Sequence, residues 1–151
     1  MAGSTITFEL VVGLPVMRRA VGFLFGHSEL SARECFLALG DEARRNLLAR
    51  MNYWIAWNNS PAKWFHGFPN DPEHKNCFVF KYQEKRFYGF LYHPTPKSNP
   101  RFQLCVLCSY DSKSEWETDM VHLNRAEAWL LAAAAILAIR RLFPDEEAKK
   151  R

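Results

Sequence analysis

The sequence has few cysteines and no long apolar run, and these absences exclude two classes of protein. Four cysteines in 151 residues are too few and too scattered for a disulfide-stapled secreted domain. The longest uncharged apolar stretch, residues 128–139, has about half the length needed to span a bilayer. Arg18 and Arg19 follow the first apolar run, where a signal peptide would have its cleavage site. We therefore expect a cytoplasmic protein with reduced thiols and no membrane segment.

Motifs for several chemistries are also missing. No glycine-rich nucleotide loop, paired carboxylates, Ser/His/Asp arrangement or internal repeat is visible. Cys105 and Cys108 form a lone C-x-x-C, but residues three apart in a strand point to opposite faces and cannot bind one ion. His66, His74 and Cys77 could supplement the pair, yet the spacing fits no standard zinc pattern. We expect buried free cysteines, no metal and no other cofactor.

What is present favours one packed domain over residues 1–151. A hydrophobic fraction of 48% and an aromatic fraction of 15% are ample for a core. Only the polar tail, residues 144–151, is expected to be disordered. The net charge of +4 permits binding to a phosphate backbone without demanding it.

The expected elements make an α+β protein, in which helices cover one face of a small antiparallel sheet. They are a strand over residues 5–12, helices over 16–25, 30–39 and 41–57, a loop over 61–75, strands over 76–82, 86–92 and 102–108, and a long helix over 119–143. Whether residues 1–28 belong to the core stays open.

Positive charge is concentrated between residues 73 and 101, where the sequence has six basic residues and only two acidic ones, Glu73 and Glu84. The six are Lys75, Lys81, Lys85, Arg86, Lys97 and Arg101. Arg86 and Arg101 begin adjacent strands, and a guanidinium group presents a planar fork suited to phosphate oxygens.

The chain resembles the RelE/ParE/HigB superfamily of bacterial toxins, most closely its HigB-like, phage-derived members. The resemblance lies in the helical sequence of residues 42–50, the three strands and the segment over residues 113–126. Thr118, Leu123, Arg125 and Ala126 fall on matching positions of a capped helix start. The resemblance covers roughly residues 34–127. It implies a RelE-like fold, a cognate antitoxin protein and ribosome-dependent cleavage of mRNA without a metal.

Such cleavage needs a proton acceptor, cations on the phosphoryl oxygens and a proton donor. The candidate catalytic residues are Arg86, Arg101, Lys113, His122 and His93. The candidate RNA-binding residues are Lys81, Lys85, Tyr88 and Arg125, with Tyr88 as a base-stacking side chain. The alternative is that these charges are solvated or protect a sheet edge.

The chain departs from the family pattern at four positions. Ser109 stands where the family has a histidine, Glu117 replaces a lysine, Asp119 replaces a proline, and only Lys113 remains of several lysines in the turn. These changes favour an alternative function, that of a catalytically inactive binding module of the same fold. A further alternative is that the chain is a structural or interaction protein of a mobile element.

Residues 129–139 are apolar on nearly every face of the expected helix, and they lie within the segment 128–142 that would contact a partner. Such a helix is buried either in its own domain or against a partner. The partner would be an antitoxin segment or a second copy of this chain.

Overall fold

The structure, a computed structural model, describes residues 5–57, 62–95, 99–112 and 120–142. Within them lie ten helices and strands. They are β1 (Thr7–Gly13), β2 (Arg19–Phe25), α1 (Ala32–Leu37), α2 (Asp41–Ala56), β3 (Phe65–Gly67), β4 (Cys77–Tyr82), β5 (Lys85–Tyr92), β6 (Gln103–Ser112), α3 (Met120–Leu130) and α4 (Ala133–Arg140).

All six strands form one sheet in the order β1-β2-β6-β5-β4-β3. Four pairings are antiparallel and β2 runs parallel to β6, so the sheet is mixed. The α+β class is confirmed, but the sheet is larger than the sequence predicted and is not purely antiparallel. The expected strands over 76–82, 86–92 and 102–108 correspond to β4, β5 and β6, with β6 reaching Ser112.

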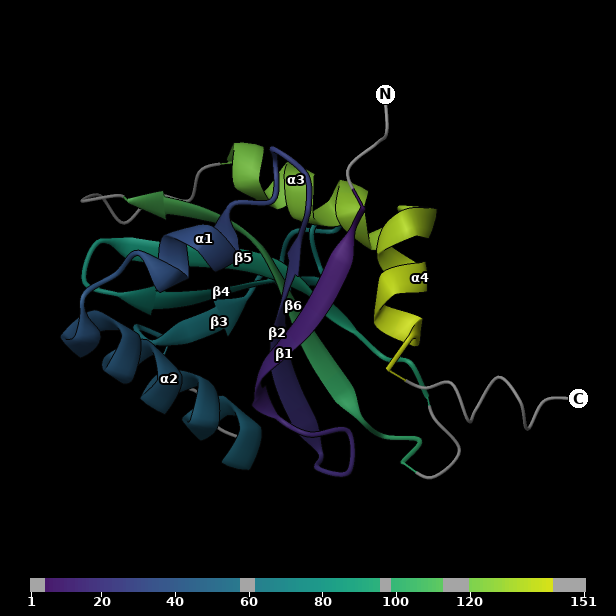
Figure 1. Cartoon of the computed structure of the whole chain (residues 1–151), viewed down its shortest axis with the longest axis horizontal. Coiled ribbons are helices and arrows are strands. Elements are labelled where there is room, and N and C mark those ends of the chain that lie inside the picture. The colour runs from purple at the N-terminus through teal and green to yellow at the C-terminus, as the bar shows by residue number, and fades with distance from the viewer. Residues whose placement is uncertain (1–4, 58–61, 96–98, 113–119, 143–151) are drawn as a thin grey trace, which may run out of the picture.

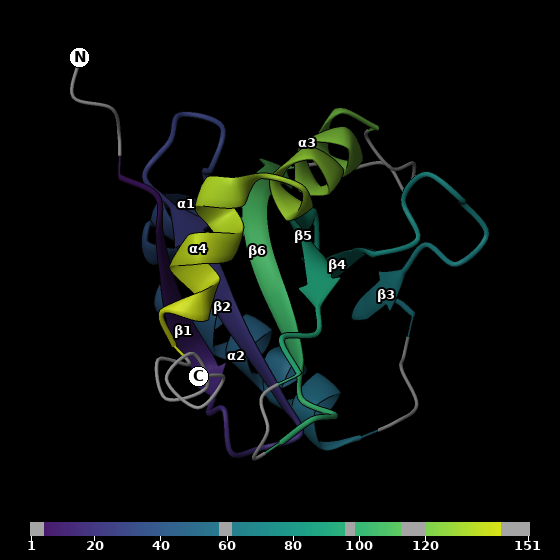
Figure 2. The ribbon, with the colours of Figure 1, turned by 90° about the vertical axis from the view of Figure 1, so that its right-hand side faces the viewer.

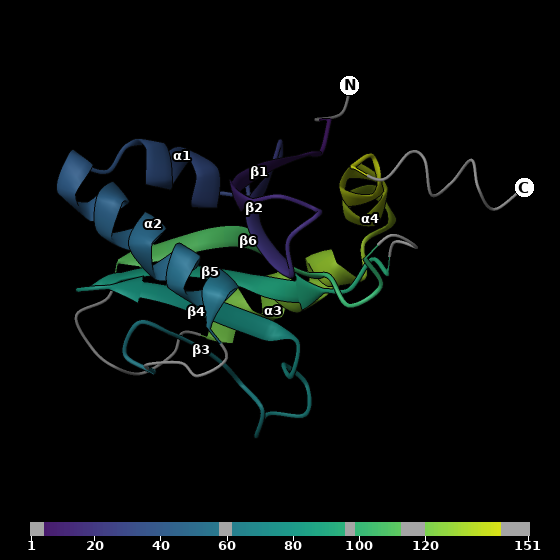
Figure 3. The same ribbon diagram turned by 90° about the horizontal axis from the view of Figure 1, so that it is seen from below.

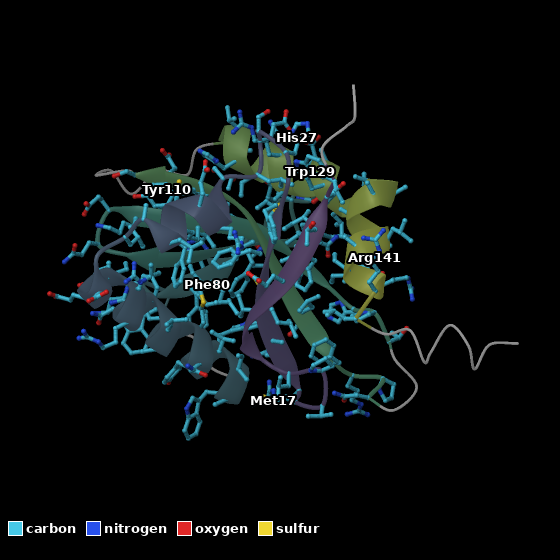
Figure 4. The ribbon with its side chains drawn as sticks, viewed as in Figure 1. Met17, His27, Phe80, Tyr110, Trp129 and Arg141 are labelled. Carbon is cyan, nitrogen blue, oxygen red and sulfur yellow. The ribbon has the colours of Figure 1, made fainter. Side chains whose placement is uncertain are left out.

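The helices cover both faces of the sheet, where the sequence predicted helices on one face (Figures 1 and 3). One core joins the sheet to α1 and α2, and its members include Leu47, Trp54 and Phe80, all buried. Phe80 of β4 lies between the sheet and α2 (Figure 4). On the opposite face α4 covers β1 and β2 while α3 lies over β5 and β6 (Figure 2).

The predicted helix over residues 16–25 is wrong, because residues 19–25 form β2. Val21, Phe23 and Leu24 are all at most 2% exposed, since β2 is a central strand with both faces covered. A strand buried on both sides loses its alternation and reads as a continuous apolar run. The predicted loop over 61–75 likewise contains the short strand β3, which pairs with β4.

The predicted long helix over 119–143 is two helices, α3 and α4, that turn at residues 131 and 132. Ala132 has an extended ψ of 126°, which ends the first helix and begins the second. This turn lets Ala135, Ala138 and Ile139 pack against the sheet, so one face of the apolar segment is buried within its own chain. Residues 144–151 lie outside the described residues.

Candidate functional site

The candidate site lies on the α3 side of the sheet, at the end of β4, β5 and β6 that is next to the β4–β5 turn. Lys81, Arg86 and Asp111 are paired across three neighbouring strands and form one row. Val79, Tyr88 and Ser109 form the next row on the same face. Paired residues of adjacent strands have Cβ atoms about 5 Å apart, so the ladder itself places these side chains together.

A β-bulge in β6 decides which side chains reach this face. The register between β5 and β6 shifts at Tyr88/Gly89, so that Ser109 pairs with Tyr88 but Leu107 pairs with Gly89. Leu107 packs on the α1–α2 side, and uninterrupted alternation would send Ser109 to the same side. The extra residue instead aims Ser109 at α3, as bulges commonly re-aim side chains beside functional sites.

His122 of α3 is packed down onto the two rows. Its ring stacks on Tyr88 with centroids 5.0 Å apart and planes 7° from parallel. Its Nδ1 lies 2.9 Å from Ser109 Oγ, and its Nε2 lies 3.8 Å from Asp111 Oδ2. The sequence shows no Ser/His/Asp arrangement, yet the fold assembles one. Because Ser109 is fully buried, it cannot attack a substrate, and this group instead fixes α3 against the sheet.

The basic side of the site combines Lys81 and Arg86 with His66 of β3. Arg86 Nη1 donates to the carbonyls of Gln83 and Lys85, 2.5 and 3.1 Å away, which anchors its guanidinium at the β4–β5 turn. Partial burial, reinforced by the Arg86 charge, lowers the pKa of Lys81. The two cations therefore act on each other across the strand pair.

His66 is the group best suited to accept a proton here. Burial lowers the pKa of His66, and the charges of Lys81 and Arg86 lower it further, against an opposing hydrogen bond to the Gly67 carbonyl. The ring is therefore neutral near pH 7. Its Nδ1 lies 2.8 Å from the Gly67 oxygen, so Nδ1 carries the proton and Nε2 keeps its lone pair.

A pocket of about 340 Å³ adjoins His66 and is lined by residues 66–71. Phe68 stands edge-on to the His66 ring, with centroids 5.0 Å apart, and packs against the α3 core. The far end of the pocket is held by His74, which is 3% exposed. Its Nδ1 lies 2.7 Å from Asp71 Oδ2 and its Nε2 lies 2.7 Å from Asn124 Oδ1. His74 thus joins the loop between β3 and β4, the pocket loop (residues 68–76), to α3.

Of the predicted catalytic residues, only Arg86 and His122 are brought together with the Lys81 row. Arg86 and Arg101 do begin adjacent strands, but β5 and β6 are antiparallel, so the two residues lie at opposite ends. At about 3.3 Å per residue, strand geometry separates them by roughly 20 Å. The exposed His93 follows β5 at the Arg101 end. Lys113 lies outside the described residues.

The predicted RNA-binding residues are also divided. Lys81 belongs to the site, whereas Lys85 lies on the other face, where it lines a hollow with Gly40 and Glu42 and pairs with Glu84 at 3.3 Å. Tyr88 is 2% exposed and stacks on His122, so a base cannot stack on it in this conformation. Arg125 is half-buried on α3.

Sequence reasoning missed the roles of His66, Ser109 and Asp111. His66 sits in a segment with three prolines, and only the β3–β4 pairing brings it beside Lys81. Ser109 and Asp111 required the bulge. Cys105 and Cys108 pack in different cores on opposite faces, as alternation predicts, and no cluster of three potential metal ligands occurs among the described residues.

No protein-family model, no curated protein and no solved structure matches this chain. Across the described part of the chain, no helix combines the length and apolar character that a membrane span requires.

Proposed function

We propose that the protein is the toxin of a type II toxin–antitoxin system, of the RelE/ParE/HigB kind, and that it cleaves RNA without a metal. One observation carries the proposal. Lys81 and Arg86 form a cation pair on one sheet face beside His66, whose lowered pKa leaves it able to accept a proton. This combination supplies the charge stabilisation and the base that attack by a 2′-hydroxyl requires.

The reaction follows from these roles. Nε2 of His66 takes the proton of the RNA 2′-hydroxyl as its oxygen forms a bond to the adjacent phosphorus. The guanidinium of Arg86 stabilises the charge that develops on the phosphoryl oxygens. The bond from phosphorus to the 5′-oxygen breaks, and the Lys81 ammonium, whose pKa is lowered, gives that oxygen a proton. The products are a 2′,3′-cyclic phosphate and a 5′-hydroxyl end.

A catalytically inactive binding module of the same kind is the second candidate. Asp111 supports it, because this carboxylate stands in the same row as Lys81 and Arg86 and offsets part of their charge. Ser109, where the family has a histidine, is fully buried and offers no proton-transfer group. Such a module would bind RNA or a protein target without cutting it.

The antitoxin is the expected partner, and the protein would act in the cytoplasm. On α4 the opposite face from the sheet exposes Leu137, which is 59% accessible, and Leu131 just before the helix is 77% accessible. These side chains suit either an antitoxin segment or a homodimer through residues 128–142.

Tightly induced expression, with primer extension on total mRNA, tests the function. We expect rapid growth arrest and new mRNA 5′ ends. Lys81→Gln, Arg86→Gln and His66→Asn should each reduce cleavage about a hundredfold or more, the lower end of the range for one acid–base or charge-stabilising group. Arg45→Gln, which changes an exposed arginine of α2, is the matched control and should cleave normally.

The other outcomes are equally informative. Arrest with intact mRNA would refute the nuclease and favour the binding module. Three variants that retain full cleavage would remove this site from the chemistry. Healthy growth with abundant protein would remove the toxin function altogether.

A further inference from the structure

A second basic pocket lies at the opposite end of the strands from the candidate site. It has a volume of about 330 Å³ and is lined by Arg18, Arg19, Arg101 and Gln103. Arg18 and Arg19 come from the end of the β1–β2 hairpin, near Met17 in Figure 4, and Arg101 precedes β6. The described residues that line this pocket include three arginines and no carboxylate.

The walls of the pocket are fixed by hydrogen bonds. Arg19 Nε donates to Gln103 Oε1 at 2.9 Å, and its Nη1 donates to the carbonyls of Trp54 and Trp57 at 2.6 and 3.2 Å. The same guanidinium lies 4.6 Å from the centroid of the Trp54 ring. Arg19 is thus a structural side of the pocket, and Arg101, which is exposed, is the side open to a ligand.

The loop beside the pocket is also anchored. Asn99 Nδ2 donates to the carbonyls of Pro15 and Met17 at 2.8 and 2.6 Å, and the amide of Gln103 donates to the Arg18 carbonyl. Three guanidinium groups held together repel one another, so an anion placed among them relieves that repulsion. Each guanidinium group is planar and can donate several hydrogen bonds at once, so a group of arginines such as this one suits a phosphate.

Trp57, which follows α2, contacts Arg19 through its backbone and carries an exposed aromatic ring near Tyr53. Trp57 is 58% exposed, and its carbonyl is the one that Arg19 holds. Single-stranded nucleic acids are bound by just this combination, in which cations track the phosphates and aromatic rings stack on the bases.

We infer that this pocket is a docking site for single-stranded RNA, with a backbone phosphate on Arg101 and Arg18 and a base stacked on Trp57. The choice of RNA as the anion rests on the proposed function. The pocket lies roughly 20 Å along the strands from Arg86, so it would hold the RNA at a distance from the reacting phosphate.

The test measures fluorescence anisotropy of a 2′-O-methyl oligouridine of about ten nucleotides, which cannot be cleaved, between about 50 and 200 mM salt. Arg101→Gln should weaken binding several-fold and lower the slope of log affinity against log salt by about 0.7, the value for one phosphate contact on a single strand. Trp57→Ala should weaken binding about tenfold and leave the slope unchanged. Arg45→Gln, the control, should change neither.

Two results would overturn the inference: an Arg101→Gln variant that behaves like Arg45→Gln, or a wild-type protein that does not bind the oligonucleotide. The inference would also be overturned if the protein bound phosphatidylglycerol vesicles through Arg101 but did not bind RNA. That result would indicate that the exposed Leu14, Val16 and Met17 contact a lipid surface. If Lys81→Gln retains cleavage while Arg101→Gln still weakens binding, the proposed active site fails and this pocket stands.

Discussion

Asn124→Ala should destabilise the protein in a pH-dependent way, because it removes half of the contact that holds the pocket loop to α3. Both ring nitrogens of His74 face oxygen atoms, Asp71 Oδ2 and Asn124 Oδ1, each at 2.7 Å. Only the imidazolium form can donate to both at once. Burial by itself lowers the pKa of His74, but the two hydrogen bonds and the charges of Asp71 and Glu73 outweigh it and raise that pKa.

The sign of the pH dependence follows. A raised folded-state pKa means that the stabilisation from His74 is complete below its unfolded value of about 6.5 and is lost as the pH rises through the folded value. The hydrogen bond to His74 lowers the pKa of Asp71, so the contribution of that carboxylate is present above about 3.9 and is lost as the pH falls through its folded value. The contact is therefore strongest between about pH 4 and 6.5.

A hydrogen bond to a charged group contributes about 1.5–3 kcal/mol, and a neutral one about 1 kcal/mol. Because Asn124 is exposed and water can replace its oxygen, the lower end applies. We expect Asn124→Ala to reduce the free energy of unfolding by about 1.5 kcal/mol near pH 5.5 and by less than about 1 kcal/mol near pH 9. For a domain of this size the larger value lowers the Tm by roughly 3–6 °C.

Urea unfolding followed by circular dichroism at the two pH values measures both numbers. Asn52→Ala is the matched control, since Asn52 is also an exposed helical asparagine and its side chain donates to the Leu48 carbonyl of its own helix. It should be nearly neutral and independent of pH. Equal destabilisation of Asn124→Ala at both pH values would refute the charged hydrogen bond, and no destabilisation would refute the contact itself.

Two further outcomes test the sheet and the cores. Gly89→Ala should cost at least about 3 kcal/mol or prevent folding, because an added Cβ would lie 2.0 Å from the Val106 carbonyl oxygen across the sheet; Gly40→Ala, with open space around it, should cost less than about 1 kcal/mol by thermal unfolding. A thiol reagent should modify only the half-buried Cys35 in the native protein and all four cysteines in denaturant. Burial raises the pKa of Cys77 to about 12 and holds the other two buried thiols protonated, so rapid native reaction of two or more would contradict these cores.

The sequence predicted the elements whose pattern is set locally. The α2 helix begins at Asp41 after Gly40 and keeps its buried residues, such as Leu47 and Met51, at helical spacing. β4 and β5 follow aromatic runs bounded by a tight turn. Prediction failed at β2, because burial on both faces leaves no alternation of apolar and polar residues along the strand. It also failed at the α3–α4 turn, where the helix changes direction to cover β1 and β2. Both failures come from tertiary packing.

Part of the candidate site was also within reach of the sequence. Alternation places Lys81, Arg86 and Tyr88 relative to the turn between β4 and β5. The distance between Arg86 and Arg101 was predictable as well, because two residues that begin consecutive antiparallel strands lie at opposite ends of the pair. His66 was not predictable, since nothing local indicates that its three-residue strand pairs with β4.

The bulge in β6 has the largest effect on what the site can do. Without it, alternation from Leu107 would turn Asp111 toward α1 and α2, and the row of Lys81 and Arg86 would contain no acid. With it, a carboxylate lies beside two cations and 3.8 Å from Nε2 of His122. One inserted residue therefore sets both the net charge of the face and the position of α3. The choice between an RNA-cleaving site and an RNA-binding one depends on how far Asp111 neutralises its neighbours, which is a property of the strand register as much as of composition.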